Sequence, residues 1–226
     1  MQNETRQTSE KFNDFVQKYK SPIKFILIFI GVAFFGFIIS YSVISSLRKK
    51  DNGKIEELNG RYELLKGEIT EDSENEDIET LINDLQSFAE KASAYAGGKA
   101  FGIIANIYKQ RKLLDEAEAA WVKAAMKAQK TYLEPMAWFN AAGLAEELGH
   151  YDQAIEYYTN TLSTYFDFPL AVNSQFSIAR IKEAQGDYDG AIEAFRSVIT
   201  GWSYNTVWTN LAHSRITVLE AQKSAN

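Results

Sequence analysis

The feature that most constrains the fold is an internal repeat with a period of 37 residues in the C-terminal half of the chain. At this period three columns of residues recur without a slip. Two columns consist of alanine, and the third is aromatic and follows the second alanine by one helical turn. The columns are Ala105, Ala142 and Ala179; Ala117, Ala154 and Ala191; and Trp121, Tyr158 and Phe195. A fixed period of this length is typical of a solenoid made from one repeated structural unit.

Each repeat contains a point where a helix is expected to end and the chain to reverse. Gly149 and Gly186 mark this point in the second and third units, because glycine readily adopts the left-handed backbone that ends helices. Lys112 stands at the same position in the first unit. An acidic residue, which favours a helix N-terminus, follows each turn: Asp115, Asp152 and Asp189. The pattern predicts pairs of antiparallel helices and an all-α fold.

The recurring alanines have a simple packing role. Small side chains allow two helices to approach closely, and the aromatic residue one turn later fills the space beneath them. Each pair still exposes an apolar face, which the next pair buries. At least three units are therefore needed, and the two ends of the stack must differ from its middle.

Helical spacing also predicts end-pieces on both sides of the repeats. We expect residues 54–68 and 76–93 to form a divergent first helical pair, and residues 204–222 to form a capping helix. The side chains of the capping helix expected to point inward are Val207, Leu211, Ile216 and Leu219.

The segment from Trp138 to Leu162 carries a specific resemblance. It reads WFNAAGLAEELGHYDQAIEYYTNTL and resembles the tetratricopeptide repeat family. The usual period of that family is 34 residues, so each unit here is three residues longer. The third unit also departs from the family, because Gln175 stands where a large aromatic residue is common. The resemblance implies a stack of helical pairs in which the first helix of each pair lines an inner groove.

The resemblance also identifies candidate residues for binding a partner protein in that groove. They are Lys99, Asn106 and Lys109 in the first unit, Met136, Phe139 and Asn140 in the second, and Asn173, Phe176 and Arg180 in the third. In the carboxylate-binding members of the family, cations are wanted where Asn173 and Ser177 stand here, so we do not expect that mode. Three alternatives stay open: the groove binds apolar peptide side chains or a partner helix, or it is filled by the end-pieces of the same chain.

An uncharged apolar run from Phe25 to Leu47 precedes the repeats. It contains 23 residues, with Lys24 before it and Arg48, Lys49 and Lys50 after it. As a helix it is roughly 34 Å long, enough to cross a hydrocarbon core of about 30 Å. A cleaved signal peptide would have a shorter apolar region ending in small residues at a cleavage site. We therefore predict a retained transmembrane helix over residues 23–47.

The charges around this segment leave its orientation undecided. Within about fifteen residues of the segment, four basic residues precede it and five follow it. The rule that positive loops stay in the cytoplasm therefore favours neither side.

Composition excludes several classes of function. Residues 48–226 hold 19 basic and 27 acidic residues, and such an acidic domain repels a nucleic acid backbone. The chain has no cysteine, and its two histidines, His150 and His213, have no partner at a spacing typical of a metal site or a catalytic base. We predict no catalytic residue, cofactor, metal or small-molecule substrate.

The predicted order of parts is a short tail (1–22), a transmembrane helix (23–47), a linker with a divergent helical pair (48–96), three tetratricopeptide-like repeats (97–203) and a capping helix (204–226). This layout resembles the YfgM-type ancillary subunits of the SecYEG translocon. The resemblance implies a single-pass protein of the bacterial inner membrane, with repeats in the periplasm and with translocon subunits and chaperones as partners. The alternative is a scaffold subunit of an envelope machine such as a flagellar motor or secretion apparatus.

Overall fold

A computed structural model describes residues 14, 17–71, 75–164 and 167–225. The chain divides into two compact units, Met1–Lys49 and Lys50–Asn226, and each is considered by itself.

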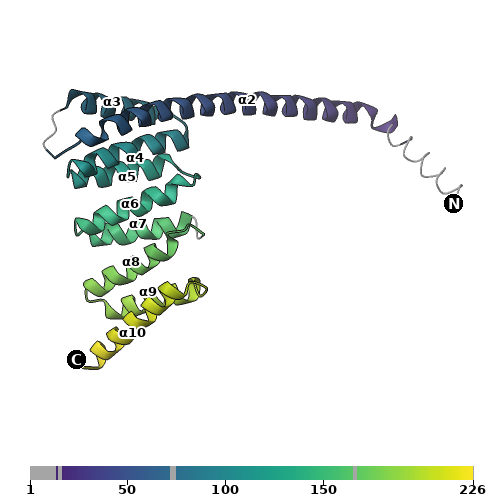
Figure 1. The fold of residues 1–226 in the computed structure, drawn as a ribbon. Helices are drawn as coiled ribbons and strands as arrows, with labels where there is room; N and C mark the ends of the chain where they lie inside the picture. Colours follow the sequence, from purple (N-terminus) through teal and green to yellow (C-terminus); the bar gives the residue numbers. More distant parts are fainter. Residues whose placement is uncertain (1–13, 15–16, 72–74, 165–166, 226) are drawn as a thin grey trace. The chain divides into compact units, whose positions relative to one another are not determined.

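The described residues form helices and contain no strand. The helices are α2 (Lys20–Leu65), the short 3-10 helix η1 (Lys66–Glu68), α3 (Glu76–Lys91), α4 (Ala94–Gln110), α5 (Leu114–Lys127), α6 (Leu133–Glu147), α7 (Tyr151–Thr164), α8 (Ala171–Ala184), α9 (Tyr188–Gly201) and α10 (Thr206–Ala225). Figure 1 shows the helices from α3 to α10 stacked one after another, with α4 and α5, α6 and α7, and α8 and α9 forming pairs. The all-α prediction and the solenoid of helical pairs are confirmed.

The columns identified from the 37-residue period lie in the core of this stack. All six recurring alanines are fully buried, and Trp121, Tyr158 and Phe195 are at most 7% exposed. The alanines let the two helices of a pair approach closely. Where the helices lie further apart, the aromatic rings fill the space between them.

The turn within each unit has one backbone arrangement. The residue at the turn has a positive φ, which is 60° at Lys112, 79° at Gly149 and 81° at Gly186. In each case its amide donates to the carbonyl three residues earlier, and the next amide donates to the carbonyl five residues before it. These paired bonds satisfy the last carbonyls of the preceding helix. The prediction that the chain reverses at these positions is therefore confirmed.

A first helical pair precedes the repeats in the second unit. It consists of the C-terminal part of α2, where Ile55 and Leu58 are fully buried, and of α3, where Leu81 and Leu85 are fully buried. Asn75 begins α3 by accepting a hydrogen bond from the amide of Asp77 at 2.9 Å. Such a cap satisfies one of the free amides at a helix start.

Helix α10 packs with a different face from the one expected. Ile216 and Leu219 are buried as predicted, but Val207 is 66% exposed and Leu211 is 46% exposed. The prediction was wrong for these two residues. Apolar side chains lie on several sides of α10, so its spacing alone does not select a face. Contact with α8 and α9 selects the face with Trp208, Ala212, Ile216 and Leu219.

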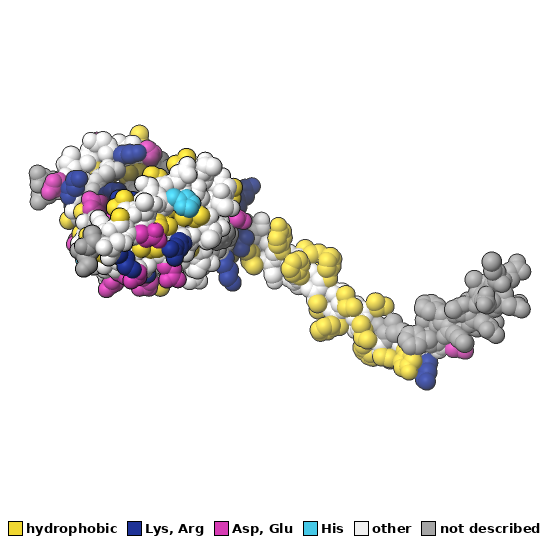
Figure 2. All heavy atoms as spheres, turned by 90° about the horizontal axis from the view of Figure 1, so that it is seen from below, with side chains coloured by type: hydrophobic (Ala, Val, Ile, Leu, Met, Phe, Trp, Pro, Cys, Tyr) yellow, Lys and Arg dark blue, Asp and Glu magenta, His cyan; other side chains and the backbone are white. Residues whose placement is uncertain are grey.

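The N-terminal compact unit, Met1–Lys49, contains the N-terminal part of α2. Every described side chain from Lys24 to Lys50 is exposed, and Figure 2 shows hydrophobic side chains all along this segment. Its most apolar stretch has a mean hydropathy of 2.5, and among the described residues α2 is the one helix long and apolar enough to cross a bilayer. A signal sequence meets the same criterion.

Two leucines of α10 form a matched test of its packing. Leu219→Ala removes a fully buried side chain and should lower the free energy of unfolding by about 2–5 kcal/mol. Leu211→Ala, in the same helix, should change it by less than about 0.5 kcal/mol because Leu211 is exposed. Urea unfolding of the two variants, followed by circular dichroism, makes the comparison. Equal losses would mean that α10 packs in the register expected from its sequence.

Candidate protein-binding surfaces

The predicted groove residues lie on the first helix of each unit. Met136, Phe139 and Asn140 share one face of α6, since residues three and four positions apart are neighbours on a helix. Asn173, Phe176 and Arg180 share one face of α8 in the same way, and Lys99, Asn106 and Lys109 lie on α4. Lys109 and Arg180 are exposed and the other seven side chains are half-buried.

The two phenylalanines of this set also pack between helices. The Phe139 ring meets the Tyr158 ring edge to face at 5.7 Å between centroids. The Phe176 ring contacts both Phe195 and Trp208, with 5.0 Å between centroids in each case. These contacts fix the rings in place, so what a partner meets is their remaining exposed surface.

Two of the three cations in the predicted set are paired within the chain. Lys99 Nζ lies 2.6 Å from Glu56 Oε1, and Arg180 Nη2 lies 2.5 Å from Glu146 Oε1. The hydroxyl of Tyr158 donates to Glu146 as well, at 3.2 Å, and burial raises the pKa of this tyrosine. These pairs connect consecutive units and leave less charge free for a ligand.

The third cation, Lys109, lies in a hollow of about 440 Å³ where the ends of α2, α4 and α6 come together. We name it the basic hollow. Its polar lining comes from three lysines, two amides, a tyrosine and a glutamate, and one leucine completes it. These residues are Lys66, Lys109, Lys112, Asn106, Gln110, Tyr62, Glu147 and Leu114.

The lysines of the basic hollow are weakly neutralised. Lys66 has one solvent-exposed partner, Glu63, at 3.7 Å. For Lys109 and Lys112 no carboxylate within ion-pair distance occurs in the part of the chain that the structure describes. Gln110 donates to the Tyr62 hydroxyl at 2.8 Å. Burial raises the pKa of Tyr62, and Lys66 and the Gln110 hydrogen bond offset this only in part. The pKa therefore lies above its ordinary value, and the phenol is neutral and can still donate its proton.

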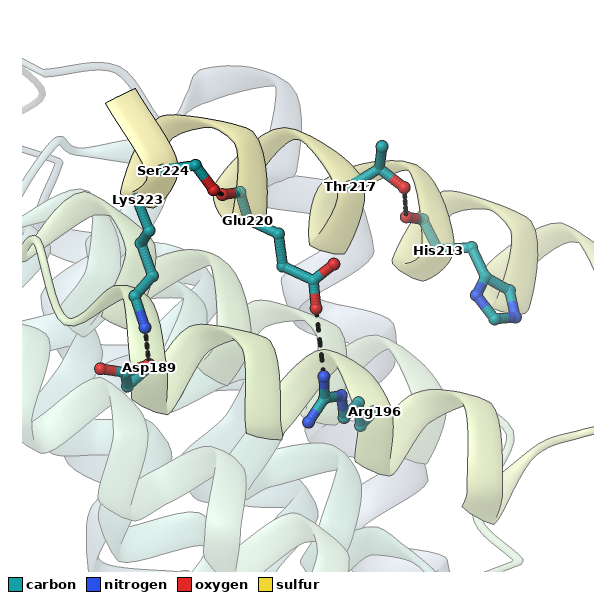
Figure 3. Close-up of polar contacts among 7 residues, drawn as sticks. All are labelled: Asp189, Arg196, His213, Thr217, Glu220, Lys223 and Ser224. Carbon is teal, nitrogen blue, oxygen red and sulfur yellow. Dashed lines mark hydrogen bonds and ion pairs between the residues drawn. The ribbon is translucent and has the colours of Figure 1, made fainter. Parts of the chain in front are cut away.

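A larger hollow of about 680 Å³ lies between α9 and α10, where three carboxylates line it with two cations, and both cations are already paired. Figure 3 shows Lys223 paired with Asp189 and Arg196 paired with Glu220, the latter at 3.1 Å. Thr217 and Ser224 donate to backbone carbonyls one turn earlier in α10. Because both of its cations are paired within the chain, this hollow has no free cation with which to select an anionic ligand.

Sequence reasoning missed a contact of His150. Its Nδ1 lies 3.1 Å from Oε2 of Glu118, a carboxylate that is only 8% exposed. Glu118 occupies the column that holds Ile155 and Ile192 in the next units. Burial and the neighbouring Glu118 raise the pKa of Tyr157. The partner was missed because it lies 32 residues away, although an acid in an apolar column was a visible signal.

Sequence reasoning also missed most of the basic hollow. Lys66 and Lys112 are 46 positions apart and meet only through packing of the first helical pair against α4. One signal was present, because Lys112 stands in a column whose other members are glycine.

The repeated helical pairs define an α-solenoid of the kind that acts as an interaction module. The tetratricopeptide repeat family model matches residues 104–159 and 141–206. A TPR repeat-containing protein of Treponema pallidum (strain Nichols) is 30% identical over 122 residues, which are 54% of this chain and 49% of the relative. The chain thus matches about half the length of that relative. These findings support tetratricopeptide repeats in residues 104–206.

A solved structure supports the fold itself. The nearly identical TPR-like repeats of a kinesin light chain candidate from Podosopora anserina superpose with a TM-score of 0.52. The match covers 76% of this chain and 89% of that chain at 13% identity. At this identity the match supports a shared fold and no shared function.

The turn column offers a reciprocal test of backbone strain. Lys112→Gly should raise the free energy of unfolding by about 1 kcal/mol, because lysine is disfavoured at φ 60° and glycine is not. Gly149→Lys should lower it by a similar amount, since an added Cβ meets open space there and only the backbone strain counts. Both values follow from denaturant unfolding. A loss of stability in Lys112→Gly would show that the lysine side chain contributes packing that outweighs the strain.

Proposed function

We propose that this protein is a membrane-anchored protein–protein interaction module. One observation carries the proposal: a stack of tetratricopeptide-like helical pairs shares its chain with an uncharged apolar segment whose side chains are exposed on all sides. The fold is typical of non-enzymatic interaction modules. The apolar segment is typical of a helix that lies in lipid.

The residues around the apolar segment favour a bilayer anchor. An apolar surface of this extent is costly in water and is a mark of a membrane or protein contact. Lys24 precedes it, and Arg48, Lys49 and Lys50 follow it. Long cationic side chains of this kind extend from a helix end towards lipid headgroups while their stems stay in the apolar layer.

Within this class we propose an ancillary role at the SecYEG translocon of the bacterial inner membrane. The repeats would face the periplasm and bind translocon subunits and chaperones, with residues 23–47 in the bilayer. The layout resemblance to YfgM-type subunits supports this assignment.

Protease treatment of intact spheroplasts tests the orientation. With an epitope tag after Asn226, added protease should remove the tag before lysis, because the repeats lie outside the cytoplasm. A cytoplasmic protein in the same spheroplasts reports their integrity. Protection of the tag until lysis would place the repeats in the cytoplasm and exclude the translocon and chaperone role proposed here.

Site-specific photocrosslinking tests the partner and the groove together. A photoreactive amino acid at Asn140, on the groove face of α6, should crosslink to a translocon subunit or a periplasmic chaperone in living cells. Gln153, an exposed residue of α7, is the control position outside the groove. Crosslinks to a motor or secretion-apparatus subunit would replace the translocon role with the scaffold role. Equal crosslinking at both positions would argue against the groove.

A further inference from the structure

We propose that the basic hollow binds an acidic segment of a partner polypeptide. The inference rests on the proposed function, because it names the chemistry of one partner that an interaction module of this kind recognises. It concerns residues other than most of the predicted groove set, since only Asn106 and Lys109 belong to both.

The first argument is charge. The hollow brings together Lys66, Lys109 and Lys112 beside Glu147, within a domain that is acidic as a whole. The exposed Glu63 offsets Lys66 at 3.7 Å, while Lys109 and Lys112 have no carboxylate at ion-pair distance among the described residues. Like charges held near one another without counter-charges repel, so their juxtaposition favours an anionic ligand. The paired charges between α9 and α10 provide the contrast, because there each cation already has its carboxylate.

The second argument is the backbone of Lys112. The turns at Lys112, Gly149 and Gly186 have the same pair of backbone hydrogen bonds, so the turn itself needs no side chain. Glycine adopts this conformation without strain, whereas lysine does not. A side chain kept at a strained position next to the unpaired Lys109 points to a role in binding.

Lys130 is the other non-glycine residue with positive φ among those the structure describes, at 62°. It differs from Lys112 because its own amide donates to the Glu134 carboxylate at 2.7 Å, which accounts for the local backbone. Lys130 also lies outside the hollow. It is therefore a suitable control for the effect of relieving strain at a left-handed lysine.

The third argument is the remaining lining, which favours a peptide over other anions. The amide of Asn106 and the hydroxyl of Tyr62 can bond a carboxylate or a backbone group, and Leu114 offers an apolar contact beside them. A volume of about 440 Å³ has room for several groups at once. A nucleic acid is disfavoured because the acidic domain around the hollow would repel its phosphates.

The test measures binding of a fluorescein-labelled decapeptide with four glutamates to the full chain in detergent, by fluorescence anisotropy. A peptide with glutamines in place of the glutamates is the ligand control. The double variant Lys109→Gln with Lys112→Gly removes two charges from the hollow. Lys123→Gln with Lys130→Gly removes two charges outside it and relieves the strain of the other left-handed lysine.

We expect the glutamate peptide to bind about tenfold more tightly than the glutamine peptide, since the unpaired lysines supply the attraction. The hollow variant should lose about tenfold in affinity, while the control variant stays within about twofold of wild type. Higher salt should weaken binding, because screening acts on exposed charges. Denaturant unfolding of both variants checks that neither loses its fold.

Three results would overturn the proposal: equal binding of the two peptides, equal losses in the two variants, or complete displacement of the peptide by millimolar inorganic phosphate, which would indicate a site for a small anion. Photocrosslinking at Asn140 separates this outcome from failure of the proposed function. If the crosslinks persist while peptide binding at the hollow fails, the interaction module stands and only the hollow is wrong. If the crosslinks fail as well, the proposed function falls with it.

Discussion

The close approach of paired helices is the constraint on which the helical stack of Lys50–Asn226 depends. It requires small residues at the crossings, and the six alanines of the repeat columns are all fully buried. Helices α4 and α5 extend the same requirement to glycine. A Cβ added at Gly98 would lie 2.6 Å from that of Ala128, and one added at Gly102 would lie 3.0 Å from the Trp121 ring. Larger side chains at these positions would push the pair apart.

Polar contacts accompany this apolar stack and give it direction. Arg111 pairs with Glu79 at 2.5 Å, Arg215 pairs with Glu183, and Lys223 pairs with Asp189. The two residues of each pair lie on, or at the end of, different helices and are 32 or 34 positions apart in the sequence. Exposed ion pairs each contribute only about 0–1 kcal/mol. Their value lies in register, because apolar burial is non-directional and does not by itself select which turn of one helix faces which turn of the next.

Two unusual contacts arise where the repeat departs from its own pattern. Glu118 enters an apolar column and pairs with His150, and Lys112 enters a glycine column and borders the basic hollow. Neither residue helps the local structure, because Glu118 buries a carboxylate and Lys112 strains the backbone. Departures from local consistency of this kind are expected at functional sites.

The sequence by itself determined the helical pairs, their turns at Gly149 and Gly186, the buried alanine and aromatic columns, and the apolar segment before them. These follow from periodicity and backbone preferences that act within a few residues. Only the tertiary structure decided that α10 buries Ala212 and exposes Leu211, and that Lys66 and Lys112 border one hollow. The physical reason is that a buried face and a shared site depend on which distant segments pack together, and local spacing does not specify that.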